Sequence, residues 1–98
     1  MMLDKMKQLW EMQKKMQELK RELERTVFEV ESPDGLVKVK MNGSQQVQEV
    51  TIPGGLEGAD KARLEKAVKE ALNRAIKRSQ EIATEKMKQI SGLNLPGL

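Results

Sequence analysis

The fold is decided by a stretch in the middle of the chain, Gly35-Leu36-Val37-Lys38-Val39-Lys40-Met41-Asn42-Gly43. Within it, Val37, Val39 and Met41 lie on one side of an extended chain, opposite two lysines and one leucine. A period of two with one apolar face is typical of a half-buried strand. Asp34-Gly35 and Asn42-Gly43 favour tight turns, because both pairs tolerate positive φ. The stretch therefore predicts the middle strand of an antiparallel meander.

The residues on both sides of this stretch continue the same pattern. Residues 26–32 alternate, with Phe28 and Val30 on one face. Residues 46–52 alternate more weakly, which indicates an edge strand or a partly exposed one. We expect strands at about 26–32, 36–41 and 46–52. Pro53 ends the last of them, as proline does at strand ends.

The first segment, residues 2–25, contains neither Gly nor Pro and consists mostly of good helix formers. Its apolar residues follow heptad spacing, which predicts a helix with a packing seam. Leu3, Met6 and Trp10 lie about a third of a turn away from that seam. This wide apolar arc predicts contact with a second helix or with a second subunit.

The last long segment, residues 60–91, has the strongest helical period in the chain. Asp60 is a plausible N-cap, and many alanines lie on the apolar stripe, which implies close packing on the sheet. A helix of this length measures about 45 Å, whereas strands of about six residues reach only about 20 Å. The helix must therefore extend past its sheet. Because Ile82, Met87 and Ile90 lie in that extension, we expect a second subunit to cover them.

These elements predict one domain over residues 1–98, with an α+β fold. The order is α-β-β-β-α in two layers, with long projecting helices, and the chain is expected to form a homodimer. Residues 92–98 form a short apolar tail that either docks on a partner or frays. Small chains bury little surface alone, which makes oligomerisation a common source of the missing core.

Composition excludes several functional classes. The chain of 98 residues contains no Cys and no His, so disulfides, cysteine-type zinc sites and histidine-based catalysis are excluded. No His is present to activate the Ser and Thr hydroxyls, which leaves only a Ser–Lys dyad or a carboxylate pair as a catalytic arrangement, and no phosphate-binding glycine motif is present. No apolar run approaches the roughly 20 residues that span a bilayer. We expect a cytoplasmic protein that is not an enzyme, with no metal, no cofactor, no small-molecule substrate and no membrane partner.

The basic residues are the remaining signal. Residues 60–91 contain nine Lys and Arg against five Asp and Glu, whereas residues 26–52 contain two against four. Four basic residues of the first helix fall within about 40° of one another, opposite the seam. The candidate contacts with an anionic partner are Lys7, Lys14, Arg21, Arg25, Arg63, Lys66, Arg74, Lys77 and Arg78, and Lys88 shares the outer half of the last helix.

Two interpretations of these charges stay open. They are either solvated faces with interleaved ion pairs or phosphate contacts, which give salt-dependent affinity and little sequence specificity. With one Phe, one Trp and no Tyr, the chain lacks the stacking platforms of single-strand binders. Duplex DNA is the nucleic acid that this composition fits best. A membrane surface fits less well, since the last helix needs its apolar face for the sheet.

The ordered set of elements resembles the YbaB/EbfC family of nucleoid-associated DNA-binding proteins. The resemblance rests on residues 12–17 and 35–39, on Asn42-Gly43, and on 50–53, 73–75 and 85–87, together with the Leu-Pro-Gly tail. Ile52 departs from it, because many members carry an acidic residue before the proline. The resemblance implies a homodimer whose paired helices project like the arms of tweezers and hold duplex DNA. It also implies a nucleoid location, weak sequence specificity and a role in chromosome organisation or gene regulation.

A second function fits the same sequence. The chain could be a dimeric adaptor that binds another protein through the apolar start of its first helix and its C-terminal tail. Leu3, Met6 and Trp10 and residues 93–98 suggest this alternative. Both hypotheses predict a dimer, so oligomeric state alone does not separate them.

Overall fold

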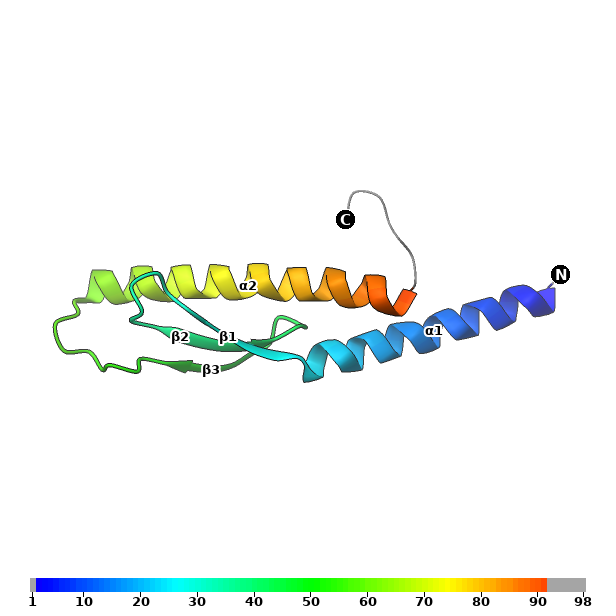
Figure 1. The fold of residues 1–98 in the computed structure, drawn as a ribbon, viewed down its shortest axis with the longest axis horizontal. Helices are drawn as coiled ribbons and strands as arrows, with labels where there is room; N and C mark the ends of the chain where they lie inside the picture. The colour runs from blue at the N-terminus through cyan, green and yellow to red at the C-terminus, as the bar shows by residue number, and fades with distance from the viewer. Residues whose placement is uncertain (1, 92–98) are drawn as a thin grey trace.

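A computed structural model describes residues 2–91 of the chain. It contains two helices and one three-stranded antiparallel sheet, which confirms the expected order of elements and the fold class (Figure 1). The observed strands are slightly shorter than the expected ranges. The elements are α1 (Met2–Arg25), β1 (Val27–Glu31), β2 (Lys38–Asn42), β3 (Val47–Thr51) and α2 (Lys61–Ser91).

β2 is the central strand, as its alternation predicts. The strands lie in the order β1-β2-β3, and both pairings are antiparallel. Val39 is opposite Val30 on one side and Val50 on the other. An irregularity between Lys40 and Met41 shifts the register of the second pairing. On the other face, Lys38 lies 3.5 Å from Glu29 and 3.9 Å from Glu31. This lysine therefore forms ion pairs between β2 and β1.

The core lies between the sheet and α2, which runs along it (Figure 1). Val37, Val39 and Met41 are buried there. Opposite them lie three buried alanines of α2 at intervals of four residues, Ala67, Ala71 and Ala75. Because alanine keeps the two backbones close, the helix fits flat on the strands. The N-cap is also as expected, since the Arg63 amide donates to Asp60 Oδ1 at 2.7 Å.

α2 leaves one strand uncovered. Val47 and Val50 belong to the inner face of the sheet by register, yet their exposed fractions are 47% and 50%. β3 therefore is an exposed edge strand, in agreement with its weak alternation. Contiguous exposed apolar side chains of this kind mark a surface that packs against another molecule.

The first turn of the meander is built around a carboxylate. Asp34 Oδ1 accepts hydrogen bonds from the Ser32 hydroxyl at 2.7 Å and from the Leu36 amide at 3.0 Å. Together with Arg63, these donors lower the pKa of Asp34 from 3.8 to about 2. Gly35 follows at φ 74°, as the sequence predicts for this turn.

The second turn differs from the expectation. The residue with positive φ is Gln45, at 61°, and neither Asn42 nor Gly43 has this conformation. Gly43 is required for space instead, because a Cβ there would lie 2.9 Å from Leu23 Cδ2. Its amide donates to the Leu23 carbonyl at 2.9 Å, which ties the end of α1 to the meander.

The extension of α2 is covered differently from what we expected. The C-terminal half of α2 and the C-terminal half of α1 lie side by side beyond the sheet (Figure 1). Leu19 of α1 and Ile82 of α2 are both buried. Ile82 is therefore buried within the single chain, where α1 contacts α2, and the expectation that a second subunit covers it is wrong. Met87 and Ile90 are half-buried, and their cover by a second subunit stays a prediction. The rest of α1 projects freely, and the molecule measures 68 × 25 × 17 Å.

Candidate nucleic-acid interface

The projecting helix α1 carries three basic side chains on one exposed face. They are Lys7, Lys14 and Arg21, which follow one another at intervals of seven residues. Among the described residues, no carboxylate lies within 4.0 Å of any of the three. The intervals correspond to about 10 Å along the helix axis. Their charges are thus available to an external anion.

Lys14 contacts an aromatic ring rather than an acid. Its Nζ lies 4.0 Å from the centre of the Trp10 ring. A cation over a ring face is attracted by the quadrupole of the ring, by about 0.5–1 kcal/mol at an exposed site. The contact holds both side chains on the basic face of α1. Sequence reasoning left Trp10 out of the candidate site, although the spacing of four residues from Lys14 was a usable signal.

Arg25, the fourth candidate on α1, has a local partner. Its Nη2 lies 2.6 Å from Glu22 Oε1 at the end of the helix. The side chains are 68% and 37% exposed, so the pair is solvated and contributes little stability. Arg25 can exchange this partner for a phosphate at small cost, but its charge is already partly balanced.

Two candidates on α2 hold the fold together. Arg63 Nε donates to Asp34 Oδ2 at 3.2 Å, which links the start of α2 to the first turn of the meander. Arg74 Nη1 donates to the Glu31 carbonyl at 3.2 Å, at the end of β1. The structure therefore gives both residues a place in tertiary packing, and it does not bring them to the face of Lys7, Lys14 and Arg21.

The last three candidates lie on the exposed side of α2. Lys66 pairs loosely with Glu70 at 3.9 Å, and Arg78 lies 3.5 Å from Glu81. Lys77 has no acidic partner among the residues described. Such exposed pairs within one helix are worth about 0.3–0.5 kcal/mol and are easily exchanged.

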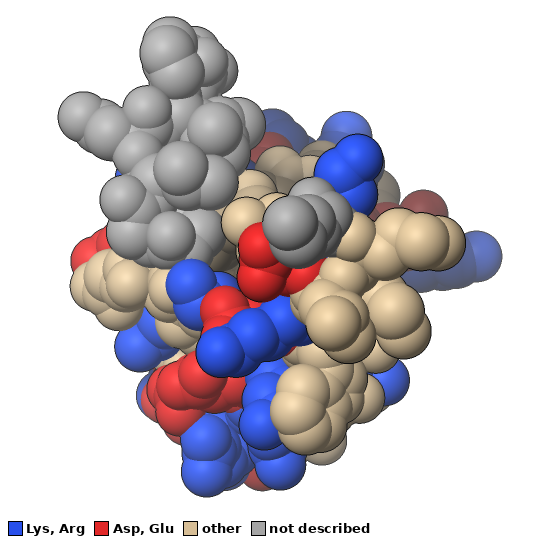
Figure 2. All heavy atoms as spheres, turned by 90° about the vertical axis from the view of Figure 1, so that its right-hand side faces the viewer, with Lys and Arg blue, Asp and Glu red and all other residues tan. Residues whose placement is uncertain are grey.

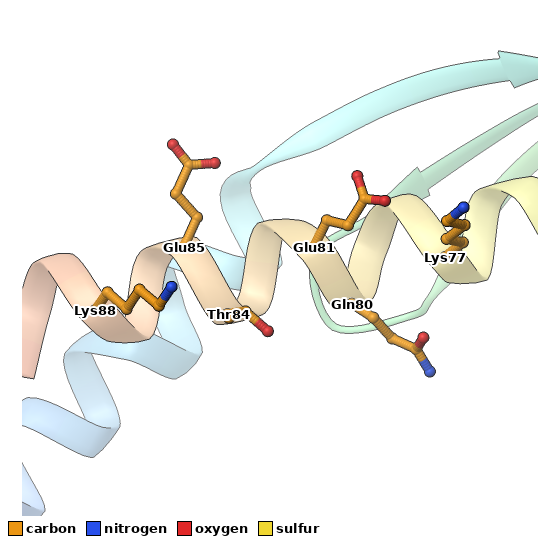
Figure 3. Close-up of a pocket in the computed structure, with 6 residues that line it drawn as sticks. All are labelled: Lys77, Gln80, Glu81, Thr84, Glu85 and Lys88. Atoms are coloured by element: carbon orange, nitrogen blue, oxygen red, sulfur yellow. The ribbon is translucent and has the colours of Figure 1, made fainter. Parts of the chain in front are cut away.

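A shallow depression follows the outer side of α2 near these residues (Figure 3). It is lined by Lys77, Gln80, Glu81, Thr84, Glu85 and Lys88. Figure 3 shows Glu81 and Glu85 pointing to one side of the helix, and Gln80 and Thr84 to the other. Both signs of charge line the depression, so as a whole it is a poorer phosphate site than the basic face of α1, although Lys77 at its end has no acidic partner among the described residues.

The end view of the molecule gives the same picture of mixed charge. On the face seen in Figure 2, where α1 projects towards the viewer, Lys and Arg side chains are interspersed with Asp and Glu. Over the described residues, no group of three potential ligands could hold a metal ion. Within residues 2–91, neither helix is long and apolar enough to cross a membrane.

Comparison with known proteins gives this basic face a context. The sequence profile of the YbaB/EbfC DNA-binding family matches residues 1–93, nearly the whole chain. The chain belongs to this family. The YbaB/EbfC family consists of nucleoid-associated proteins that bind DNA and are not enzymes, so the expectation of a non-enzyme is confirmed.

Individual relatives agree with the YbaB/EbfC assignment. A nucleoid-associated protein of Legionella pneumophila (strain Corby) is 38% identical over 92 residues, which cover 93% of this chain and 82% of the relative. One from Anaeromyxobacter dehalogenans (strain 2CP-C) is 37% identical over 95 residues, covering 95% and 92%. The crystal structure of an uncharacterized protein from Helicobacter pylori has a TM-score of 0.60 and 24% identity, with coverage of 89% and 98%. At that identity the structure supports the fold alone.

Proposed function

We propose that this protein binds duplex DNA as a homodimer, mainly through phosphate contacts and with little sequence specificity, in chromosome organisation or gene regulation. The observation that carries the proposal is the row of Lys7, Lys14 and Arg21 on a projecting helix, without acidic partners among the described residues. A membership in a DNA-binding family gives these cations a natural partner.

The chemistry of the row fits a DNA backbone. Each lysine or arginine that meets a phosphate releases counterions, so affinity falls steeply with salt but hardly depends on sequence. The ion pairs of Lys66 and Arg78 are exposed and readily exchanged. We therefore assign the main contacts to Lys7, Lys14, Arg21 and Lys77, with secondary contacts from Arg25, Lys66 and Arg78.

Self-association is supported by exposed apolar surfaces on α1 and on the sheet. Leu9, Met12 and Met16 form an exposed seam on α1, opposite its basic face. Val47 and Val50 are exposed on the sheet. A second copy that covers these surfaces would complete the core of a small chain. It would also present two basic helix faces to one duplex, which multiplies the number of phosphate contacts.

The test replaces Lys7, Lys14 and Arg21 together with Gln and measures binding to a fluorescently labelled duplex by anisotropy. We expect affinity to fall at least tenfold at low salt, and the salt slope to decrease by about one for each lost contact. The matched control is Lys40→Gln, a lysine of the sheet outside the proposed site. Analytical ultracentrifugation at micromolar concentration should find a dimer for each variant. Unchanged affinity in the triple variant refutes the assigned face, and a monomeric wild type refutes the dimer.

A further inference from the structure

One feature of α1 is not explained by phosphate contacts. Leu3, Met6 and Trp10 are exposed, at 81%, 66% and 61% of their surface. On the helix circumference, Trp10 lies about 40° from Lys14 and about 20° from Arg21, but far from the heptad seam. Leu3 and Trp10 therefore lie on the basic face and are directed away from the proposed dimer seam, whereas Met6 lies between that face and the seam.

The ring of Trp10 is oriented but remains accessible. Lys14 Nζ sits 4.0 Å from the ring centre and so covers part of one ring face. The residue as a whole is 61% exposed, so much of the ring remains in contact with solvent. Along the axis, Trp10 lies between Lys7 and Lys14, about 4.5 Å from the first and about 6 Å from the second. The arrangement is an apolar ring between two cations.

Duplex DNA offers the complementary surface. Two rows of phosphates border each groove, and the sugars and base edges between them carry no net charge. Proteins that use this surface place apolar side chains in a groove and basic side chains on the bordering phosphates. An acidic protein could neutralise the lysines, but it would not require a bulky ring between them. The ring beside the cations, in a member of a DNA-binding family, thus favours the nucleic acid as the occupant.

We propose that Trp10 enters a groove of the duplex and contacts sugars and base edges, while Lys7 and Lys14 bind phosphates on either side. This inference rests on the proposed function and adds a non-ionic contact to it. Leu3, two turns towards the N-terminus, extends the same apolar contact, and Met6, one turn away, lies at its edge. The contribution of an uncharged ring is independent of counterion release, so it persists as salt is raised.

The experiment compares wild type with Trp10→Ala, Trp10→Phe and Gln8→Ala, using a labelled duplex at several salt concentrations. Gln8 is exposed on the opposite side of the same helix and is the matched control. We expect Trp10→Ala to weaken binding roughly tenfold with an unchanged salt slope. Trp10→Phe should stay within about threefold of wild type, because it keeps an aromatic ring. Gln8→Ala should bind like wild type.

Intrinsic fluorescence gives an independent readout, since Trp10 is the sole tryptophan and the chain has no tyrosine. Saturation with unlabelled duplex should quench or shift its emission. If wild type binds DNA but this emission and the Trp10→Ala affinity stay unchanged, Trp10 lies outside the interface and only this inference fails. If Trp10→Ala dissociates the dimer in ultracentrifugation, the ring is a subunit contact and the inference is also overturned. If wild type does not bind the duplex at all, the proposed function itself fails.

Discussion

Asp34 links the first turn of the meander to the start of α2. Its carboxylate accepts from the Ser32 hydroxyl, from the Leu36 amide and from Arg63. All three donors stabilise the charged form, and the pKa is accordingly lowered to about 2. The residue shows how a turn that is readable from local sequence also acquires a tertiary role. Its partner Arg63, 29 positions away, could not be identified from spacing.

The pH dependence of stability should report this carboxylate. Because the folded pKa is below the unfolded value of 3.8, the ionised form stabilises the fold above about pH 4. That stabilisation is lost as pH falls through about 2. We expect Asp34→Asn to be less stable than wild type at pH 7, with a difference that shrinks between pH 4 and pH 2. Urea denaturation at a series of pH values measures it, and a difference that stays constant down to pH 2 contradicts this role.

Gly43 is a second residue whose role depends on distant contacts. A Cβ there would meet Leu23 Cδ2 at 2.9 Å and the Leu23 carbonyl oxygen at 3.1 Å. We expect Gly43→Ala to destabilise the protein by about 1–3 kcal/mol, because backbone has to move. Gly54→Ala is the control, since nothing lies within 4 Å of its Cβ position, and it should stay within about 0.5 kcal/mol. Equal stability of the two variants in urea would mean that α1 does not approach the turn this closely.

At the scale of elements, the helices and strands could be predicted because their signals are local. The alternation of Val37, Val39 and Met41 and the alanines of α2 each describe one face of one element. Contacts between elements could not be predicted in the same way. Ile82 is buried where α1 meets α2, and Arg74 donates a hydrogen bond to the end of β1. Both contacts depend on where the helices lie, which a periodic pattern does not specify.

The contact between the two helices is directly testable at Leu19. This residue is buried beside α2, so Leu19→Ala should cost about 2–5 kcal/mol of unfolding free energy. Leu3→Ala, at an exposed position on the same helix, should change it by less than about 0.5 kcal/mol. Both variants are unfolded in urea at the same protein concentration, because self-association adds to apparent stability. A Leu19→Ala variant that loses no more unfolding free energy than Leu3→Ala would show that α1 is not docked on α2.

For the whole molecule, the proposed DNA contacts follow the distribution of charge. Net positive charge lies on the two helical segments, while the meander from 26 to 52 is net negative. The charge count therefore assigns the candidate contacts to the helices, and this assignment stays a prediction. The sequence did not predict which cations are free, because the partners of Arg63 and Arg74 come from the distant first turn and β1. Trp10 was likewise assigned to apolar packing, and its place beside Lys14 emerged from the three-dimensional structure.

The central claim is that the protein holds duplex DNA chiefly by its phosphates. The most direct test is the affinity of the wild-type protein for a labelled duplex between about 50 and 200 mM salt, repeated with a second duplex of unrelated sequence. If four cations from each of two subunits engage phosphates, log affinity should fall linearly with log salt, with a slope of roughly −7. The two duplexes should give nearly the same affinity and slope. Affinity that is independent of salt, or absent at the lowest salt, would contradict the account.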